Sequence, residues 1–204
     1  MAAGALNPTQ TALILVGMQN DYCSPDGVKA RAGHNLTRVQ EAAHAIARMV
    51  GECRRAGFLT VFVRNEHGVE DAAMWQRRRR VALSPMPAGA RTWGAEFYLP
   101  VADSDIVVTK RRYSAFTGTA LETLLRSEGR NTVAIAGVQT HVSVLSTAIS
   151  ACDHDFSVYV VEDAVAAYSD EATEWALRTV AGHFGRLTTC ADLVRYATQG
   201  ALGG

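Results

Sequence analysis

The sequence carries no net charge, because its 204 residues include twenty basic and twenty acidic side chains. Proteins that bind nucleic acid or an anionic membrane surface usually concentrate positive charge, so we expect neither to be the main partner. The one run of like charge, Arg77 to Arg80, is typical of a solvated surface, although it could also hold an anionic substrate or the acidic surface of a partner.

Long apolar runs are also missing. No stretch approaches the ~18 apolar residues that a membrane-spanning helix needs, and no basic segment leads into an apolar run at the N-terminus. The four cysteines, at positions 23, 53, 152 and 190, show no Cys-x-x-Cys spacing and do not cluster with histidine, which favours reduced thiols. We therefore expect a soluble, cytoplasmic protein.

What the sequence does contain is an alternation of apolar strands and amphipathic helices. Strands are expected at residues 11–16, 58–63, 105–109, 133–136, 156–161 and 186–189. Helix caps are predicted at Asn35, Thr119 and Ser169, and a last helix at 191–197. This alternation predicts one α/β domain over residues 1–204, with a mainly parallel sheet covered by helices on both faces.

Other segments lack this regularity. Residues 20–33 are expected to form a loop, and residues 64–103 a long connection that is functional or holds short helices. The two ends, about 1–9 and 199–204, are small, polar and glycine-rich, and are expected to be loose.

One stretch, residues 131–147, combines a buried strand, a sharp turn and a helix start. The apolar run Val133 to Ala136 stops at Gly137, and Val142, Leu145, Ile149 and Cys152 then follow at helical spacing. At the carboxyl end of a parallel strand, the first turn of the next helix directs N–H groups and a positive dipole toward a ligand. Ser143 is expected in that turn. The candidate ligand-binding residues beside it are Val138, Gln139 and Thr140.

The run from Gly137 to Thr147 resembles the nucleophile motif of the isochorismatase-like cysteine hydrolases, which include nicotinamidases, ureidoacrylate and biuret amidohydrolases, and isochorismatases. Residues 11–23 and 107–116 resemble two further motifs of this family in the same order, and Thr92-Trp93-Gly94 is another shared feature. The resemblance covers nearly the whole chain. It implies about six strands, a homodimer or homotetramer with pockets near subunit contacts, and a cis peptide bond between Val138 and Gln139.

The chain departs from this family at two positions. The resemblance implies a catalytic aspartate, lysine and cysteine, where this sequence has Gly17, Lys110 and Ser143. Ordinary cysteine-dependent amidase activity is therefore predicted to be absent. Gly17 could make room for a bulky ligand, or could mark a decayed site.

The two remaining polar positions each have more than one interpretation. Lys110 could hold a substrate carboxylate or carbonyl oxygen, or act as an amine if desolvation lowers its pKa. Ser143 would need a base to be a nucleophile, and His141, two residues away, points elsewhere on a helix. The alternative is a serine that fills space, caps the helix or hydrogen-bonds a ligand.

Asn65, Glu66 and His67 follow the second expected strand, so they belong to the same edge of the sheet. Nicotinamidases place an Asp-x-His metal site near here, whereas Asn65 offers a neutral amide, so no metal and no cofactor is predicted. Glu66 or His67 could replace the missing acid or base, or could belong to a polar loop that anchors the long connection.

Further substrate-binding candidates come from the other motifs; these are Gly17, Gln19, Asp21, Trp93, Tyr113 and Phe116. Asp21 resembles an acidic residue that is usually structural in the family, although Asp21 or the substrate itself could also supply the missing acid or base. The aromatic side chains suit an aromatic or polycyclic ligand, although core packing explains each as well.

Two functions fit this sequence. The favoured one is a hydrolase-like enzyme with a non-cysteine mechanism that acts on a bulky small molecule, with secondary metabolism as the expected setting. The alternative is a catalytically silent protein that binds a ligand or serves as a scaffold.

Overall fold

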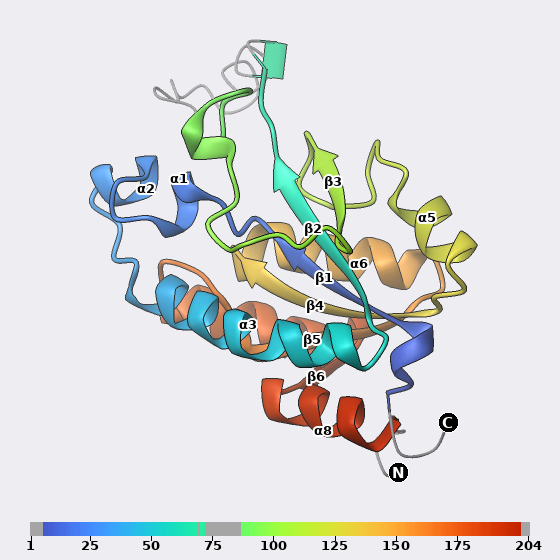
Figure 1. The fold of residues 1–204 in the computed structure, drawn as a ribbon. Coiled ribbons are helices and arrows are strands. Elements are labelled where there is room, and N and C mark those ends of the chain that lie inside the picture. Colours follow the sequence, from blue (N-terminus) through green and yellow to red (C-terminus); the bar gives the residue numbers. More distant parts are fainter. Residues whose placement is uncertain (1–5, 69, 72–86, 201–204) are drawn as a thin grey trace.

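Figure 1 shows a computed structural model of the chain, which describes residues 6–68, 70–71 and 87–200. Six strands form one sheet in the order β3-β2-β1-β4-β5-β6, and every neighbouring pair is parallel. The strands are β1 (Thr11–Val16), β2 (Leu59–Asn65), β3 (Ile106–Lys110), β4 (Thr132–Val138), β5 (Ser157–Ala166) and β6 (Arg186–Thr188). The predicted single α/β domain with a parallel six-stranded sheet is confirmed.

Helices cover both faces of the sheet (Figure 1). One face packs against α3 (Thr37–Arg55) and α8 (Cys190–Gly200), and the other against α5 (Leu121–Ser127), α6 (Leu145–Asp153) and α7 (Asp170–Thr179). Strand β1 illustrates the cause, because Leu13 and Leu15 enter the α3 core while Ala12 and Ile14 enter the opposite one. A strand that is covered on both faces is apolar throughout.

Shorter helical turns complete the described chain. They are η1 (Pro8–Gln10), α1 (Asn20–Cys23), α2 (Val28–Arg31), η2 (Trp93–Ala95), η3 (Thr140–Val144) and η4 (Val180–Phe184). Among the described residues, no helix is both long enough and apolar enough to cross a bilayer.

Several sequence-based boundaries need correction. Residues 20–33, predicted to be a loop, contain α1 and α2. The predicted loose start is wrong for residues 6–9, because Leu6 and Pro8 are buried and the Asn7 side chain caps η1. Helix α8 runs on to Gly200, so residues 199–200 are helical. The arginine run lies outside the described residues.

Strand β5 is longer than its apolar run. The sequence predicts an end at Val161, but the strand continues through exposed Glu162 and Asp163 to Ala166. Its register with β4 shifts between Ile135 and Gly137, as in a β-bulge. Because these two charged residues interrupt the apolar pattern, the sequence does not indicate that the strand continues.

The expected helix starts hold with local changes. Ser169 caps α7 as predicted, by accepting from the Ala172 N–H. Asn35 accepts from the Thr37 N–H, and α3 begins at Thr37. The capping box at Thr119 is incomplete, because its N–H donates to the Phe116 carbonyl and Glu122 instead contacts His154.

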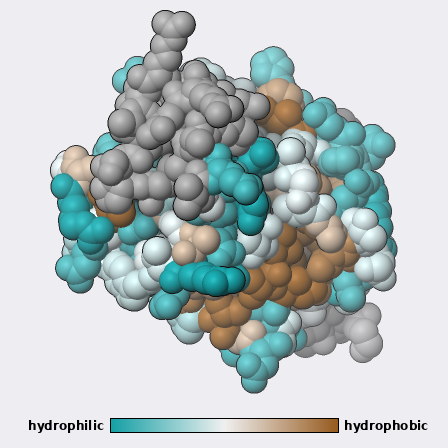
Figure 2. Space-filling model, turned by 90° about the horizontal axis from the view of Figure 1, so that it is seen from above, coloured by the Kyte–Doolittle hydropathy of each residue, from teal (hydrophilic) through white to brown (hydrophobic). Residues whose placement is uncertain are grey.

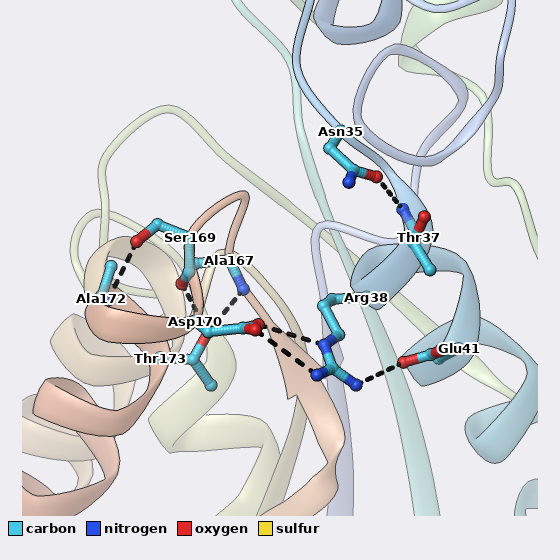
Figure 3. A network of polar contacts seen from close by, with 9 residues as sticks. All are labelled: Asn35, Thr37, Arg38, Glu41, Ala167, Ser169, Asp170, Ala172 and Thr173. Atoms are coloured by element: carbon cyan, nitrogen blue, oxygen red, sulfur yellow. Dashed lines mark hydrogen bonds and ion pairs between the residues drawn. The ribbon is translucent and has the colours of Figure 1, made fainter.

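The starts of α3 and α7 are tied together at the end of β5 (Figure 3). The Arg38 guanidinium donates to Asp170 at 3.1 Å and to Glu41 at 3.0 Å, beside a hollow of about 380 Å³. Thr173 accepts from the Ala167 N–H and so fixes the chain that enters α7. Because the Arg38, Glu41 and Asp170 side chains are mostly exposed, these ion pairs define geometry more than they add stability.

Candidate active site

The candidate residues gather where β1, β3 and β4 end. Lys110 is the last residue of β3 and pairs in register with Asn65 at the end of β2. Gly17 follows β1, and Ser143 lies in η3, directly after β4. The ends of β2 and β3 point to the top of Figure 1, so Figure 2 views the molecule from this side, where hydrophilic residues border one hydrophobic area.

Lys110 is buried, with 1% of its surface exposed. Its ammonium group donates to the carbonyl oxygens of Arg112 and Tyr113, both at 2.8 Å, and to Ser143 Oγ at 3.2 Å. No carboxylate is among these three partners. Burial lowers the pKa of Lys110 to about 7, because the charged amine loses water without gaining a countercharge.

These contacts also suit the neutral amine. A neutral amine has two N–H groups and one lone pair, and the carbonyls of Arg112 and Tyr113 can accept only from N–H groups. With both N–H groups so engaged, the lone pair faces Ser143 Oγ, which can then donate its proton to Lys110 Nζ. The residues next to Ser143 in the sequence offer no base. The fold places the amine of Lys110, 33 positions away in the sequence, beside its hydroxyl.

Gly17 is required by the backbone. It adopts φ +69°, and a Cβ there would lie 2.4 Å from the carbonyl oxygen of Val138. Gly137 on β4 has φ +115°, and a Cβ there would lie 2.1 Å from the carbonyl oxygen of Val16. Two glycines therefore let the ends of β1 and β4 approach closely. The backbone therefore accounts for a glycine at this position, and a role of Gly17 in substrate binding stays a prediction.

The turn after β4 has the predicted unusual bond, because the Val138–Gln139 peptide is cis. Thr140 opens the helical segment of η3 and α6, is buried, and its hydroxyl has no hydrogen-bond partner among the described residues. His141 is half-buried, and burial lowers its pKa. The predicted apolar stripe of this helix shifts, since Val144, Ala148 and Ala151 are buried while Val142, Ile149 and Cys152 are only partly so.

Gln19 and Asp21 are substrate-binding candidates from the sequence, but their side chains hold the backbone together. The Gln19 amide accepts from the Asn65 N–H and donates to the carbonyls of Asn65 and Ala95. The Asp21 carboxylate accepts from the N–H groups of Val28 and Ala88. Both residues are buried, and their polar atoms have backbone partners, so we assign them to the scaffold of the site.

The aromatic candidates separate. Phe116 is buried against His154 and Phe156, just before β5 begins, which is the end of the sheet opposite Lys110. Its expected role in substrate binding is therefore wrong. Trp93 and Tyr113 remain candidates, because they are 48% and 44% exposed, and the Tyr113 carbonyl contacts the Lys110 amine.

Glu66 and His67 follow β2, and their described contacts are with Lys110, Arg64, Ala88 and Ala90. The Glu66 N–H donates to the Lys110 carbonyl, while its carboxylate lies 4.0 Å from the Arg64 guanidinium. His67 pairs through its backbone with Ala88 and Ala90. Burial is the main cause that lowers the pKa of His67, so its imidazole is neutral near pH 7.

The residues near β2 do not fit a metal ion. Asn65 presents a neutral amide whose nitrogen donates to the Tyr22 hydroxyl, where a metal site would need an oxygen ligand. Within residues 6–68, 70–71 and 87–200, no group of three or more His, Cys, Asp or Glu side chains is arranged to hold a metal. We therefore derive the chemistry of the site from its side chains alone.

Sequence reasoning missed the two carbonyl groups that orient Lys110 and the carboxylate of Asp71 that contacts Arg112 at 3.2 Å. Backbone carbonyls leave no signal in a sequence. Asp71 lies in the long connection without periodicity, where only its charge could have drawn attention.

The chain is similar to known proteins over most of its length. The family model described as the isochorismatase domain matches residues 11–192. A ureidoacrylate amidohydrolase, RutB, from Variovorax paradoxus is 31% identical over 94% of this chain and 82% of its own length. Enterobactin synthase component B from Escherichia coli is 29% identical over 93% of this chain and 64% of its own length.

A solved structure shows the same fold. The cysteine hydrolase from Pseudomonas syringae pv. phaseolicola superposes with a TM-score of 0.82 over 98% of this chain and 100% of its own, at 24% identity. The strand order, the Lys110–Ser143 site at the strand ends and the match over residues 11–192 converge on one assignment. The chain belongs to the isochorismatase family.

Proposed function

We propose that this protein is a hydrolase in which Ser143 is the nucleophile and Lys110, as a neutral amine, is its base. The observation that carries the proposal is the 3.2 Å contact between Lys110 Nζ and Ser143 Oγ, with both remaining amine positions directed at carbonyl oxygens. A serine hydroxyl becomes an effective nucleophile only when a positioned base takes its proton. An amine with a pKa near 7 is suited to this task at neutral pH.

The reaction would proceed in two halves. Ser143 Oγ attacks the acyl carbon while its proton passes to Lys110 Nζ, and the ammonium then protonates the leaving group as the acyl–leaving group bond breaks. In the second half, water loses a proton to the same amine and attacks the acyl–serine ester. The carboxylic acid leaves, and Ser143 recovers its proton from the ammonium.

The helical segment that begins at Thr140 suits the negative charge that develops on the acyl oxygen. The first N–H groups of a helix have no intrahelical partner and lie at the positive end of its dipole. Those of Thr140 and His141 would therefore be the oxyanion donors. Such donors typically contribute about 10²- to 10³-fold to kcat.

The substrate class follows from this chemistry and from the relatives. Ureidoacrylate amidohydrolases act at a carbonyl carbon bonded to nitrogen, and a Ser–Lys pair serves the same type of centre. We therefore propose a small amide, ureido compound or ester as the substrate. The absence of cysteine-dependent amidase activity stays a prediction, and so does the homodimer or homotetramer.

The test is a pre-steady-state assay with p-nitrophenyl acetate. We expect a rapid release of one equivalent of p-nitrophenolate per chain, followed by slower turnover, as the acyl group accumulates on Ser143. Peptide mapping of the quenched protein should place the acetyl group there. The rate of the rapid phase should rise with pH through about 7, as the amine loses its proton.

Ser143→Ala removes the proposed nucleophile. The matched control is Ser146→Ala, three residues along the same helical segment, because Ser146 Oγ donates to the Val142 carbonyl and does not contact Lys110. The first variant should lose the rapid phase and the second should keep it. A parent protein with no rapid phase and no acetylated Ser143 would contradict the proposal and favour a silent ligand-binding protein.

A further inference from the structure

The orientation of the Lys110 amine depends on the turn that follows β3. Both of its fixed acceptors, the carbonyls of Arg112 and Tyr113, belong to residues 111–116, which form neither helix nor strand. Strand β3 is also the edge of the sheet, so this turn has a neighbouring strand on one side only. Something outside the sheet must therefore hold the turn in place.

Two side chains from outside the sheet contact this turn: Thr147 Oγ1 accepts from the Ala115 N–H at 3.1 Å, and Asp71 contacts the two arginines that follow Lys110. The carboxylate is buried, with 7% of the side chain exposed. It accepts from Arg112 Nη1 at 3.2 Å, and Arg111 Nε lies 4.0 Å away. One carboxylate thus spans the two arginines that separate Lys110 from the Tyr113 carbonyl.

Asp71 is itself anchored. Its Oδ2 accepts from the Gly68 N–H at 3.0 Å, and its own N–H donates to the Gly68 carbonyl at 3.1 Å. Burial alone would raise the pKa of Asp71, but the hydrogen bonds from Gly68 and Arg112 outweigh it, and the net shift is downward. The carboxylate is therefore charged at neutral pH, and it links the chain after β2 to the turn after β3.

We infer that Asp71 is a positioning residue for the Lys110 amine: by holding Arg112, it fixes the two carbonyl groups that direct the amine at Ser143. This inference rests on the proposed function for its catalytic meaning, although the geometric claim can be tested without any reaction. Asp71 touches neither Lys110 Nζ nor Ser143 Oγ through any contact of the described residues.

Two effects of removing the carboxylate have opposite signs. Loss of a negative charge lowers the pKa of a nearby lysine by Coulomb's law. Loss of the turn admits water to the amine and raises its pKa toward the ordinary value of about 10.4. The other titratable or charged groups on the elements around Lys110 are Glu66, His67, Arg111, Arg112 and His141. The charge of Asp71 raises the pKa of His67, so its removal favours the neutral imidazole and adds no positive charge near Lys110.

The experiment is a pH titration of lysine ¹³Cε resonances in the full-length Asp71→Asn variant. The chain has two lysines, so Lys29 is an internal reference. We expect the Lys110 pKa to rise from about 7 by roughly one pH unit or more, while the Lys29 signal titrates as in the parent. A Lys110 pKa that stays the same or falls would overturn the positioning role.

The matched control is Asp105→Asn. Asp105 is also a buried carboxylate paired with an arginine, Arg54 at 2.6 Å, but it lies just before β3, at the far end of the strand from Lys110. The Asp105→Asn variant should lower the free energy of unfolding without changing the pKa of Lys110. Arg112→Lys is a second variant, because it keeps the charge but removes the guanidinium, and it too should raise the Lys110 pKa.

The same variants separate this inference from the proposed function. In the acetylation assay at pH 7, Asp71→Asn should slow the rapid phase by about 5- to 10-fold, because a pKa raised by one unit leaves roughly a tenth of the amine neutral. If the parent protein shows no rapid phase while Asp71→Asn still raises the Lys110 pKa, the function fails and the positioning role stands. If the parent reacts normally while Asp71→Asn leaves the Lys110 pKa unchanged, the positioning role fails and the function stands.

Discussion

Replacing Lys110 with methionine should slow the acetylation of Ser143 by about 10²- to 10⁴-fold, which is the usual contribution of a positioned general base. Methionine fills most of the buried space that the lysine side chain occupies, so the change removes the amine without opening a large cavity. The rise of the rate with pH through about 7 should disappear with it. Stopped-flow measurement of p-nitrophenolate release over a range of pH checks both effects.

The same variant has an expected effect on stability. Lys110 has a lower pKa in the folded protein than in the unfolded chain, about 7 against about 10.4. Between these values the unfolded chain binds a proton that the folded protein does not, so stability rises with pH across the window, and the lysine destabilises the fold most fully below pH 7. Between about pH 7 and about pH 10.4, the free energy of unfolding of the parent should rise by roughly 1.4 kcal/mol per pH unit relative to that of Lys110→Met.

Two controls define the result. Lys29→Met removes the only other lysine and should leave the reaction unchanged, because Lys29 lies in α2. Lys110→Arg should fail to restore the rate, since a guanidinium stays protonated and is larger. If Lys110→Met reacts with p-nitrophenyl acetate as fast as the parent, Lys110 is not the base.

Gly17→Ala should lower the free energy of unfolding by about 2–5 kcal/mol. The left-handed backbone at φ +69° costs an L-residue roughly 1–2 kcal/mol. The new Cβ would lie 2.4 Å from the Val138 carbonyl oxygen, so the strand ends must move apart, and such overpacking adds about 1–3 kcal/mol. Urea denaturation followed by circular dichroism measures the change.

Gly118→Ala is the matched control, because Gly118 has φ +70° and nothing lies within 4 Å of the position of its Cβ. It carries the conformational penalty without the collision, so it should cost only about 1–2 kcal/mol. Equal losses in the two variants would show that the ends of β1 and β4 are not closely packed at Gly17. The same geometry predicts that Gly17→Asp combined with Ser143→Cys does not rebuild a cysteine hydrolase in this backbone.

The fold could be predicted because its signals are local. Apolar runs such as Thr11–Val16 mark buried strands, and the stripe on α3 contains apolar residues that are all buried in the structure. Predictions fail where a tertiary contact overrides the local signal. Glu162 and Asp163 interrupt the apolar pattern of β5, but pairing with β4 resumes beyond them at Val165.

The site was harder to predict because its chemistry depends on contacts between distant segments. The resemblance indicates Lys110 and Ser143, but neither the loss of solvent around the amine nor the two carbonyls that orient it can be read from residue types. Gln19, Asp21 and Phe116 are candidates for ligand binding only because they lie in motifs. The structure shows the first two holding the backbone and the third packed at the far end of the sheet.

A neutral Lys110 amine directed at Ser143 is the central claim, and a ¹³C titration of the two lysines tests it most directly. Protein labelled with [¹³C]lysine should give two ¹³Cε signals, and Lys110→Met identifies the one from Lys110. We predict a midpoint near 7 for Lys110, well below the ordinary lysine value of about 10.4. A Lys110 midpoint near 10.4 would mean that the amine is charged at neutral pH and cannot be the base, which would contradict the claim.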